Sequence, residues 1–400
     1  MLYRLKKSGY QAHLVGGGVR DLLLGREPKD FDVATDATPE QIKAAFGNAR
    51  IIGRRFRLVH VRFGREVIEV ATFRSMQFQQ EKQSDEGMIL RDNEFGSIEE
   101  DAMRRDFTVN ALYYNIADFS VVDYSNGMED LECGLLRLLG DPETRYREDP
   151  VRMLRAARFA AKLGFNIEAA TEEPIARLAH LLGDVPSARL YEEVLKLFVS
   201  GYAVSAFEKL RHYNLFAQLF PQTEEALAHE EHEFPLVLVR KGLENTDRRL
   251  AQDKPVTPAF LFAVLLWEPL RRIARELEEA DGLPFYQALQ QAGDVVVARQ
   301  VQQVAIPRRF STPMREIWTL QARFHNTKGK RPHRLLAHPR FRAAYDFLLL
   351  RAESGEADPE LAAWWTRFQE QQGLDPKGGG KAAEGSKRRR RRRPRKRPAQ

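Results

Sequence analysis

The fold is decided by the stretch Gly16-Gly17-Gly18-Val19-Arg20-Asp21, which is followed by Asp30-Phe31-Asp32. We expect a strand over 12–15, a glycine turn, a short helix over 19–24 and a second strand over 31–34. Residues two apart in a strand point to the same face, so Asp30 and Asp32 can reach one point in space.

This arrangement of acids and glycines predicts a chemistry. Two carboxylates on one face suit Mg²⁺, which is held by oxygen ligands and substrate phosphates. Glycines just before a helix expose backbone N–H groups that favour a triphosphate. Together they predict metal-assisted phosphoryl transfer with two metal ions. Taken alone, a triple glycine is usually only a turn, and two such aspartates are usually only a solvated strand end.

A third acid lies in an alternating run over 66–73, which we expect to form a hairpin with 57–63 around Gly64. Glu69 shares its face with Val67 and Ala71, and an acid on an apolar face is costly unless it is paired or bound to metal. For Asp106, further along the chain, a structural ion pair is the alternative to a role in the chemistry.

Two further blocks carry charged residues at regular spacing. In the block 104–112, Arg105 can clamp a phosphate, while Asp106 and Asn110 lie four residues apart. In the block 146–158, we expect Asp149 to be the N-cap and Pro150 the first residue of a helix. That helix carries a basic stripe, which is usually a solvated face but can recognise a base edge when it lies near a nucleotide; it consists of Arg152, Arg155 and Arg158.

The charge of the chain is divided between a body and a tail. Of the 63 Lys and Arg residues, 12 lie in 377–400, where there is one acid, Glu384. The body, 1–376, therefore holds 51 basic and 55 acidic residues and is close to neutral. We expect the low-complexity tail to be disordered because it has no apolar surface to bury.

The remaining composition narrows the class of protein. The 400 residues are 43% hydrophobic, which is enough for two or three domains with buried cores. The single Cys133 excludes an internal disulfide framework and fits a reducing compartment. No apolar run approaches the ~20 residues that span a bilayer, and no apolar stretch follows Lys6 and Lys7, so we expect no secretory signal and a cytoplasmic location.

The pattern along the chain predicts an α+β fold. Short strands and helices with a small mixed or antiparallel sheet occupy 1–145, and we expect no clear strand after about residue 140. Helical periodicity follows over 151–163, 190–198, 206–215 and 258–277. We predict four parts: a catalytic head over 1–145, a helical neck over 146–221 that binds base and RNA, a helical body with RNA-binding character over 222–375, and the tail over 376–400.

The ordered blocks 14–32, 104–111 and 148–158, with a helix over 186–197, resemble motifs of a known family. This is the class II tRNA nucleotidyltransferase and bacterial poly(A) polymerase family, within the polymerase β-like nucleotidyltransferase superfamily. The resemblance implies a nucleotidyltransferase head and a template-independent reaction. It implies that Asp30 and Asp32 are the catalytic metal ligands and that the third acid is Glu69 or Asp106. We favour Glu69 for the metal and Asp106 for placing the nucleotide.

The same resemblance implies roles for the remaining residues. Gly16, Gly17 and Arg20 hold the triphosphate together with Arg105. The other nucleotide-binding residues are Asp21, Asn110, Arg155 and Arg158. Asp149 and Arg152 read the incoming base through the protein itself. The implied cofactor is a pair of Mg²⁺ ions, with Mn²⁺ as an alternative ion.

Within the family, the stretch 51–61 looks like the poly(A) polymerase pattern, where enzymes that add CCA have a Gly-Thr turn. It implies transfer of AMP from ATP to RNA 3′ ends, of mRNA, small RNA or tRNA precursors, with RNA-decay proteins as candidate partners. The alternatives are CCA addition to tRNA and an inactive RNA-binding protein. Arginine-rich tails neutralise phosphates without reading sequence, and the expected RNA contacts are Arg388, Arg389, Arg390, Arg391, Arg392, Arg393, Arg395, Lys396 and Arg397.

Overall fold

The computed structural model describes residues 1–53, 57–64, 66–75, 95–228 and 234–376. It divides into two compact units, Met1–Arg315 and Glu316 onward, which are described separately. The tail and most of the polar segment that follows Ser75 lie outside the described residues.

The first unit begins with a seven-stranded mixed sheet, as the alternating pattern predicts. Every neighbouring pair is antiparallel except β2 and β5, which run parallel. The predicted hairpin is confirmed as β4 and β5. In sheet order the strands are β3 (Ala49–Ile52), β4 (Leu58–Phe63), β5 (Glu66–Thr72), β2 (Asp32–Thr35), β1 (Ala12–Val15), β6 (Leu112–Asn115) and β7 (Val121–Asp123).

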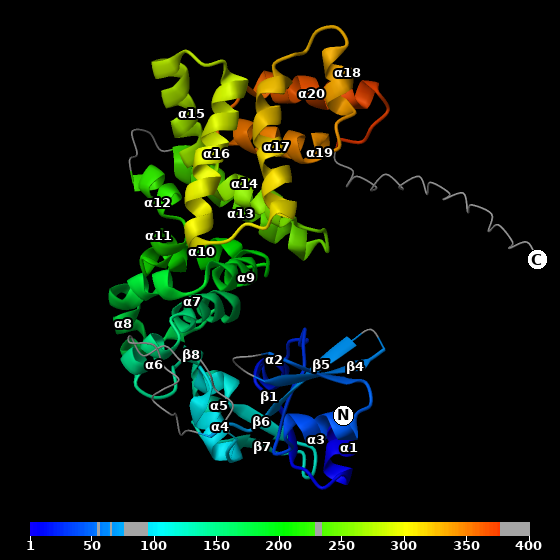
Figure 1. Ribbon diagram of the computed structural model, residues 1–400, viewed down its shortest axis with the longest axis vertical. Coiled ribbons are helices and arrows are strands. Elements are labelled where there is room, and N and C mark those ends of the chain that lie inside the picture. The colour runs from blue at the N-terminus through cyan, green and yellow to red at the C-terminus, as the bar shows by residue number, and fades with distance from the viewer. Residues whose placement is uncertain (54–56, 65, 76–94, 229–233, 377–400) are drawn as a thin grey trace, which may run out of the picture. The chain divides into compact units, whose positions relative to one another are not determined.

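One face of this sheet packs on α1 (Leu2–Lys7) and α3 (Pro39–Ala45), which lie together in Figure 1. The core between them contains Val33 and Val70 from the central strands and Phe46 after α3, each at most 2% exposed. The opposite face packs on α4 (Ile98–Arg104) near β6. The site described below lies on this second face.

Two predicted boundaries around the glycine turn are wrong by one or two residues. The helix α2 spans Gly17–Leu23, so it starts within the glycines rather than at Val19. The strand β2 starts at Asp32, so Asp30 lies two residues before it. Helix ends and strand ends are the least determined parts of a pattern, because the periodic residues lie further inside.

The rest of the first unit is helical, with one exception. The expectation of no strand after residue 140 is wrong, since the two-residue strand β9 (Asn166–Ile167) pairs in parallel with β8 (Leu135–Leu136). Two residues are too few to show a period. The helices are α5 (Gly127–Cys133), α6 (Pro142–Glu148), α7 (Val151–Leu163), α8 (Ala169–Leu178), α9 (Ser187–Phe198), α10 (Ala203–His212), α11 (Leu215–Leu219), α12 (Pro221–Ala228), α13 (Phe234–Ala251), α14 (Pro258–Leu265), α15 (Trp267–Asp281) and α16 (Phe285–Gln303), with 3-10 turns at Thr108–Asn110 and Ala179–Asp184.

The apolar pattern predicted over 258–277 is divided between α14 and α15, which separate at Leu266. Helix α17 (Arg308–Phe324) crosses the boundary between the units. The second unit adds α18 (Arg331–Leu336), α19 (Phe341–Glu353) and α20 (Pro359–Gln371). Their core is aromatic and includes Phe324, Tyr345 and Trp365.

Within the described residues, no helix combines the length and the apolar character that crossing a membrane requires. The predicted part boundaries at 145 and 221 lie inside the first unit, and the one at 375 lies inside the second. These boundaries stay predictions.

Candidate active site

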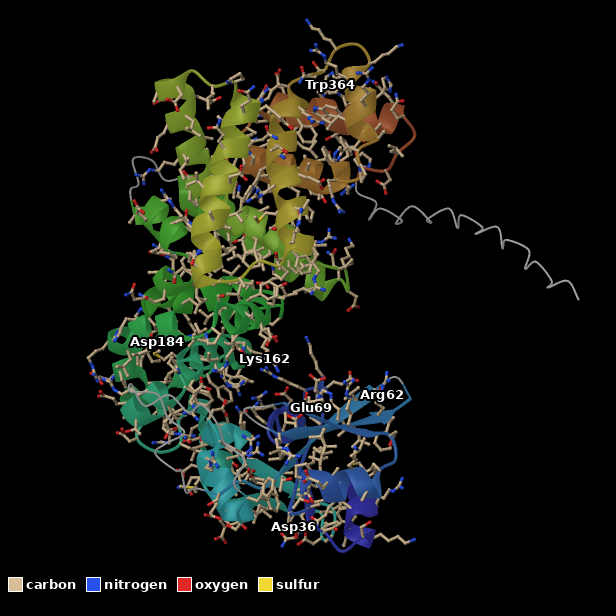
Figure 2. The ribbon with its side chains drawn as sticks, in the orientation of Figure 1. Asp36, Arg62, Glu69, Lys162, Asp184 and Trp364 are labelled. Carbon is tan, nitrogen blue, oxygen red and sulfur yellow. The ribbon has the colours of Figure 1, made fainter. Side chains whose placement is uncertain are left out.

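Strand register brings two of the predicted acids together. Asp32 is paired directly with Glu69 across the parallel ladder of β2 and β5. Directly paired residues point to the same face, so both side chains lie on the face away from α1 and α3. In Figure 2 Glu69 is labelled at the edge of the head that is nearer to Lys162 of α7.

The electrostatics of Asp32 show that its charge is poorly compensated. Burial raises the pKa of Asp32 above its ordinary value, and the charges of Glu69 and Asp30 raise it further, against a partial opposing effect of Arg105 and Arg155. The influence of Asp30 places it near Asp32 although it precedes the strand. Asp32 therefore lies in the field of two further carboxylates.

These acids fit a divalent cation by their chemistry. Carboxylate oxygens are the ligands that Mg²⁺ takes in nucleotide-processing sites, and a raised carboxylate pKa marks negative charge that the protein itself does not neutralise. Among the described residues, no three His, Cys, Asp or Glu side chains already form a metal-holding group. The carboxylates are neighbours whose oxygens would have to turn toward a common ion.

Glu69 has a neighbour that the sequence did not suggest. His60 of β4 is paired with Glu69 in the ladder, and its Nε2 lies 3.1 Å from Glu69 Oε1. His60 is partly exposed, whereas Glu69 is exposed, as is Val67 on the same face, so this face is open to solvent. The alternation of 57–63 places His60 on one face, but only the register with β5 identifies which residue it meets.

The glycine turn is held close to the acids. Gly16 precedes α2 with a φ of +75°, a conformation that side chains with a Cβ rarely adopt. A Cβ at Gly18 would lie 3.3 Å from the carbonyl oxygen of Asp30. A Cβ at Gly16 would lie 3.6 Å from a guanidinium nitrogen of Arg105. The glycine turn therefore places backbone atoms, without side chains, between Asp30 and Arg105.

Arg105 is fixed by two residues that sequence reasoning missed. Its Nε donates to Tyr113 Oη at 2.8 Å and its Nη2 donates to Asp101 Oδ2 at 3.0 Å. Tyr113 in turn donates to Asp101 at 2.6 Å. Burial by itself lowers the pKa of Arg105, but Asp101 and Tyr113 raise it above its ordinary value, so the side chain stays a cation.

Asp106 is placed differently from Glu69. Its Oδ2 accepts from Arg155 Nε at 2.7 Å, and its Oδ1 accepts from Asn110 Nδ2 at 3.1 Å and from the Phe107 amide at 2.8 Å. Burial alone would raise the pKa of Asp106, but Arg155 and these hydrogen bonds bring it far below its ordinary value. Asp106 is thus an ion-paired carboxylate that joins the head to α7.

The same network continues through the residues of α2. Buried Arg20 donates to the side chains of Asn110 and Asp21, and Asp21 also accepts from Lys162 Nζ at 2.9 Å. Arg26 donates to the Lys162 carbonyl oxygen at 3.1 Å. Five of the predicted nucleotide-site residues are therefore linked to one another before any ligand is considered: Arg20, Asp21, Asp106, Asn110 and Arg155.

The prediction that Asp149 is the N-cap of α7 is wrong. The N-cap is Pro150, and the two carboxylate oxygens of Asp149 accept from Arg189 at 2.8 and 2.7 Å. Arg189 lies on α9, within the helix predicted over 186–197. No local pattern near Asp149 indicates a partner 40 residues away, so sequence reasoning missed Arg189.

The predicted arginine stripe has three different environments. Arg152 donates to Glu148 at 3.0 Å and Arg155 pairs with Asp106, whereas Arg158 has no ion pair within the described part of the chain. Burial lowers the pKa of Arg158 to about 10, and the charge of Arg155 acts in the same direction. The guanidinium groups of Arg20, Arg155 and Arg158 lie 5.1, 5.2 and 4.4 Å from the ring centre of Phe159.

The candidate site thus contains carboxylates without an arginine or lysine partner among the described residues, a close glycine turn and a cluster of arginines on α7, an arrangement expected of a nucleotidyltransferase. Family models match the chain as "Poly A polymerase head domain" over 12–137, "Probable RNA and SrmB- binding site of polymerase A" over 164–227 and "Polymerase A arginine-rich C-terminus" over 281–397. The chain belongs to the poly(A) polymerase family.

Similarity to whole proteins agrees with this assignment. The chain is 51% identical to poly(A) polymerase I of Salmonella typhimurium over 386 residues, which cover 94% of the chain and 83% of the relative. It is 48% identical to poly(A) polymerase I of Haemophilus influenzae, with 94% and 87% covered. The CCA-adding enzyme of Bacillus stearothermophilus in complex with CTP is similar in structure, with a TM-score of 0.59 and 26% identity, covering 93% of this chain and 80% of that one. Membership in this family implies the use of divalent metal ions.

The Asp106–Arg155 pair gives a first prediction. Replacing Arg155 with Met leaves a buried carboxylate without its cation, and we expect a loss of about 3–5 kcal/mol in the free energy of unfolding at pH 7. Because the folded-state pKa of Asp106 is below its unfolded-state value, its stabilising contribution is present above the unfolded-state pKa and is lost as the pH falls through the folded-state pKa. The difference between wild type and variant should therefore shrink below about pH 4.

Urea unfolding at several pH values measures this difference. The matched control is Arg147→Met, which removes an exposed pair with Glu143 and should cost less than about 1 kcal/mol. An Arg155→Met effect as small as that of the control would contradict the structural role of the pair.

Proposed function

We propose that this chain extends RNA 3′ ends with AMP taken from ATP, without a template, and releases pyrophosphate. The observation that carries the proposal is the pairing of Asp32 with Glu69 on an open face beside the glycine turn, in a chain about half identical to poly(A) polymerase I over most of its length. Phosphoryl transfer depends mainly on positioning and on compensation of charge, and the site supplies both kinds of group.

Each group of residues has a task in this proposal. Asp30, Asp32 and Glu69 would hold the divalent ions, two Mg²⁺ with Mn²⁺ as an alternative, whose chemistry is to activate the RNA hydroxyl and to stabilise the leaving pyrophosphate. The backbone of Gly16 and Gly17 would hold the triphosphate together with Arg20 and Arg105, and Arg158 would contact the nucleotide. Asp106 acts by keeping Arg155 and Asn110 in place around the nucleotide.

The base would be read by Asp149 and Arg152. In the structure Asp149 is engaged by Arg189 and Arg152 by Glu148, so both side chains are already oriented at the start of α7. An aspartate and an arginine present complementary acceptors and donors to a base edge. The polar groups of adenine could then be selected by the protein without a nucleic-acid template.

The alternative of CCA addition has less support. CCA-adding enzymes match a smaller part of the chain, as in Lactobacillus helveticus, where 38% identity extends over 52% of it. The third alternative, an inactive RNA-binding protein, would not need Asp30, Asp32 and Glu69 in one region. We also propose a cytoplasmic location and RNA-decay proteins as partners, supported by the single cysteine and by the RNA substrate.

A product assay tests the reaction. We expect a non-tRNA oligonucleotide to be extended into a long homopolymer with ATP and to gain little with CTP, GTP or UTP alone. Gel electrophoresis of end-labelled RNA measures product length for each nucleotide. A product that stops after C, C and A on tRNA lacking its end would contradict poly(A) addition.

An acid-to-amide change tests the metal ligands. Changing even an indirect partner of a bound metal costs about 10–100-fold in activity or affinity, so Asp32→Asn should reduce AMP incorporation by at least about 100-fold. The control is Asp36→Asn at the other end of β2, whose carboxylate accepts from the Gln11 amide and lies far from Glu69 in Figure 2.

A second measurement does not depend on activity. Titration with Mn²⁺, followed by electron paramagnetic resonance, should show weakened binding for Asp32→Asn and unchanged binding for Asp36→Asn. Full incorporation by Asp32→Asn would exclude it as a ligand.

The arginine-rich tail is proposed to hold RNA, with contacts from Arg388–Arg393, Arg395, Lys396 and Arg397. Removing 377–400 should lower RNA affinity and make it less sensitive to salt, by about 0.7 in the log–log slope for each lost phosphate contact. AMP addition at saturating RNA should remain. Loss of all activity at saturating RNA would place the tail in the reaction itself.

A further inference from the structure

The second unit concentrates positive charge in one segment of its sequence. Residues 323–342 contain seven Lys and Arg and no Asp or Glu. The segment covers the last turn of α17, all of α18 and the first residues of α19. After Glu316, the next acid of the unit is Asp346. The near-neutral body therefore contains a cationic region that its total charge does not reveal.

Several cations of this segment have no acidic partner. Lys328, Lys330 and Arg334 are exposed and form no ion pair with the described residues. Among the described residues, Arg331 donates only to the side-chain amide oxygen of Asn326, at 3.0 Å. Four positive charges around the start of α18 thus have no carboxylate partner in the part of the chain that the structure describes.

The end of the segment provides a contrast. Arg340 pairs with Glu316 at 3.1 Å, and Arg342 pairs with Asp346 at 2.9 Å. The second unit therefore contains acidic residues that form ion pairs with the cations at the end of the segment. The cations at α18 are not used in this way.

An aromatic stack adjoins the unpaired cations. The ring of His333 on α18 meets Phe368 of α20 edge-on, with centres 5.1 Å apart. Phe368 lies parallel to Trp364, with an angle of 10° and centres 5.0 Å apart. Trp365 is fully buried in the core, whereas Trp364, labelled in Figure 2, is partly exposed.

We propose that these residues form a docking site for single-stranded RNA, the α18 surface, consisting of Lys328, Lys330, Arg331, Arg334 and Trp364. The cations neutralise phosphates, and the indole ring stacks on a base. Cations that follow a backbone, combined with an aromatic platform, are what single-stranded nucleic acid requires. An acidic protein surface would need the cations but not the ring. The inference rests on the proposed function in taking RNA as the substrate.

The cations are tested with the full chain and a fluorescent 20-nucleotide oligo(A), without ATP. The triple variant Lys328→Gln, Lys330→Gln, Arg334→Gln should reduce the salt slope of log affinity by about 2, from about 0.7 for each phosphate contact, and affinity by about tenfold at moderate salt. The control triple, Lys43→Gln, Arg275→Gln, Arg299→Gln, removes the same charge from exposed positions of the first unit. Equal slopes for the two triples would overturn the proposal.

The ring is tested by fluorescence. The other three tryptophans, Trp267, Trp318 and Trp365, are at most 1% exposed, so Trp364 should supply the signal that RNA quenches. Trp364→Phe should lose the quenching but keep binding, and Trp364→Ala should weaken binding by about tenfold. Quenching that persists in Trp364→Phe, or no quenching of the wild type, would exclude base stacking.

The outcome separates this surface from the proposed reaction. If the wild type adds no AMP but the two triples differ in RNA affinity, the proposed reaction fails and the surface stands. If AMP is added and the triples behave alike, the surface fails. Unchanged RNA binding together with lost binding of polyglutamate would assign the surface to an acidic protein partner and overturn the RNA proposal.

Discussion

The parallel pairing of β2 with β5 is the constraint on which the site depends. It places Asp32 beside Glu69, two like charges that would separate in a flexible chain. The opposite face of the same strands explains why they stay, because Val33 and Val70 are fixed in the core under α1 and α3. A slip of one residue would bring the acids into that core and the valines to the surface. The apolar face therefore determines the position of the acids.

This constraint divides the acids of the site into two groups. Asp21, Asp101, Asp106 and Asp149 each accept from an arginine, and together they connect the glycine turn, the head and the helices α7 and α9. Asp30, Asp32 and Glu69 have no arginine or lysine partner among the described residues. The first group organises the region around the second, whose charge is left for a ligand. By this criterion we propose that Asp106 belongs with the organising acids and that Glu69 belongs with the acids that would bind a ligand.

Sequence reasoning predicted most of the helices and strands and proposed a candidate site, but it did not identify the partners of the site residues. Alternation predicted the β4–β5 hairpin, and the order of the motifs predicted that Asp32, Glu69 and Arg105 lie in one region. Sequence reasoning placed Asp30 inside a strand and Asp149 at an N-cap, and both assignments are wrong by one or two residues. A local sequence pattern does not mark the residue at which backbone pairing ends. His60 and Arg189 could not be found in this way, because each meets its acid only through the register of strands or the packing of α9 on α7.

The net charge of the chain indicates where a polyanion could bind only when its distribution along the sequence is known. The sequence places a large excess of positive charge in the tail and a near-neutral total in the body. The structure shows that the balance of the body arises in two ways: by pairing, as along α7, and by separation, as in the second unit, where 323–342 has no acid. Paired charges cancel at short range, whereas separated charges keep their field within a Debye length of about 8–10 Å. A body that is neutral in composition can therefore still attract a polyanion at α18, far along the chain from the residues proposed to react with it.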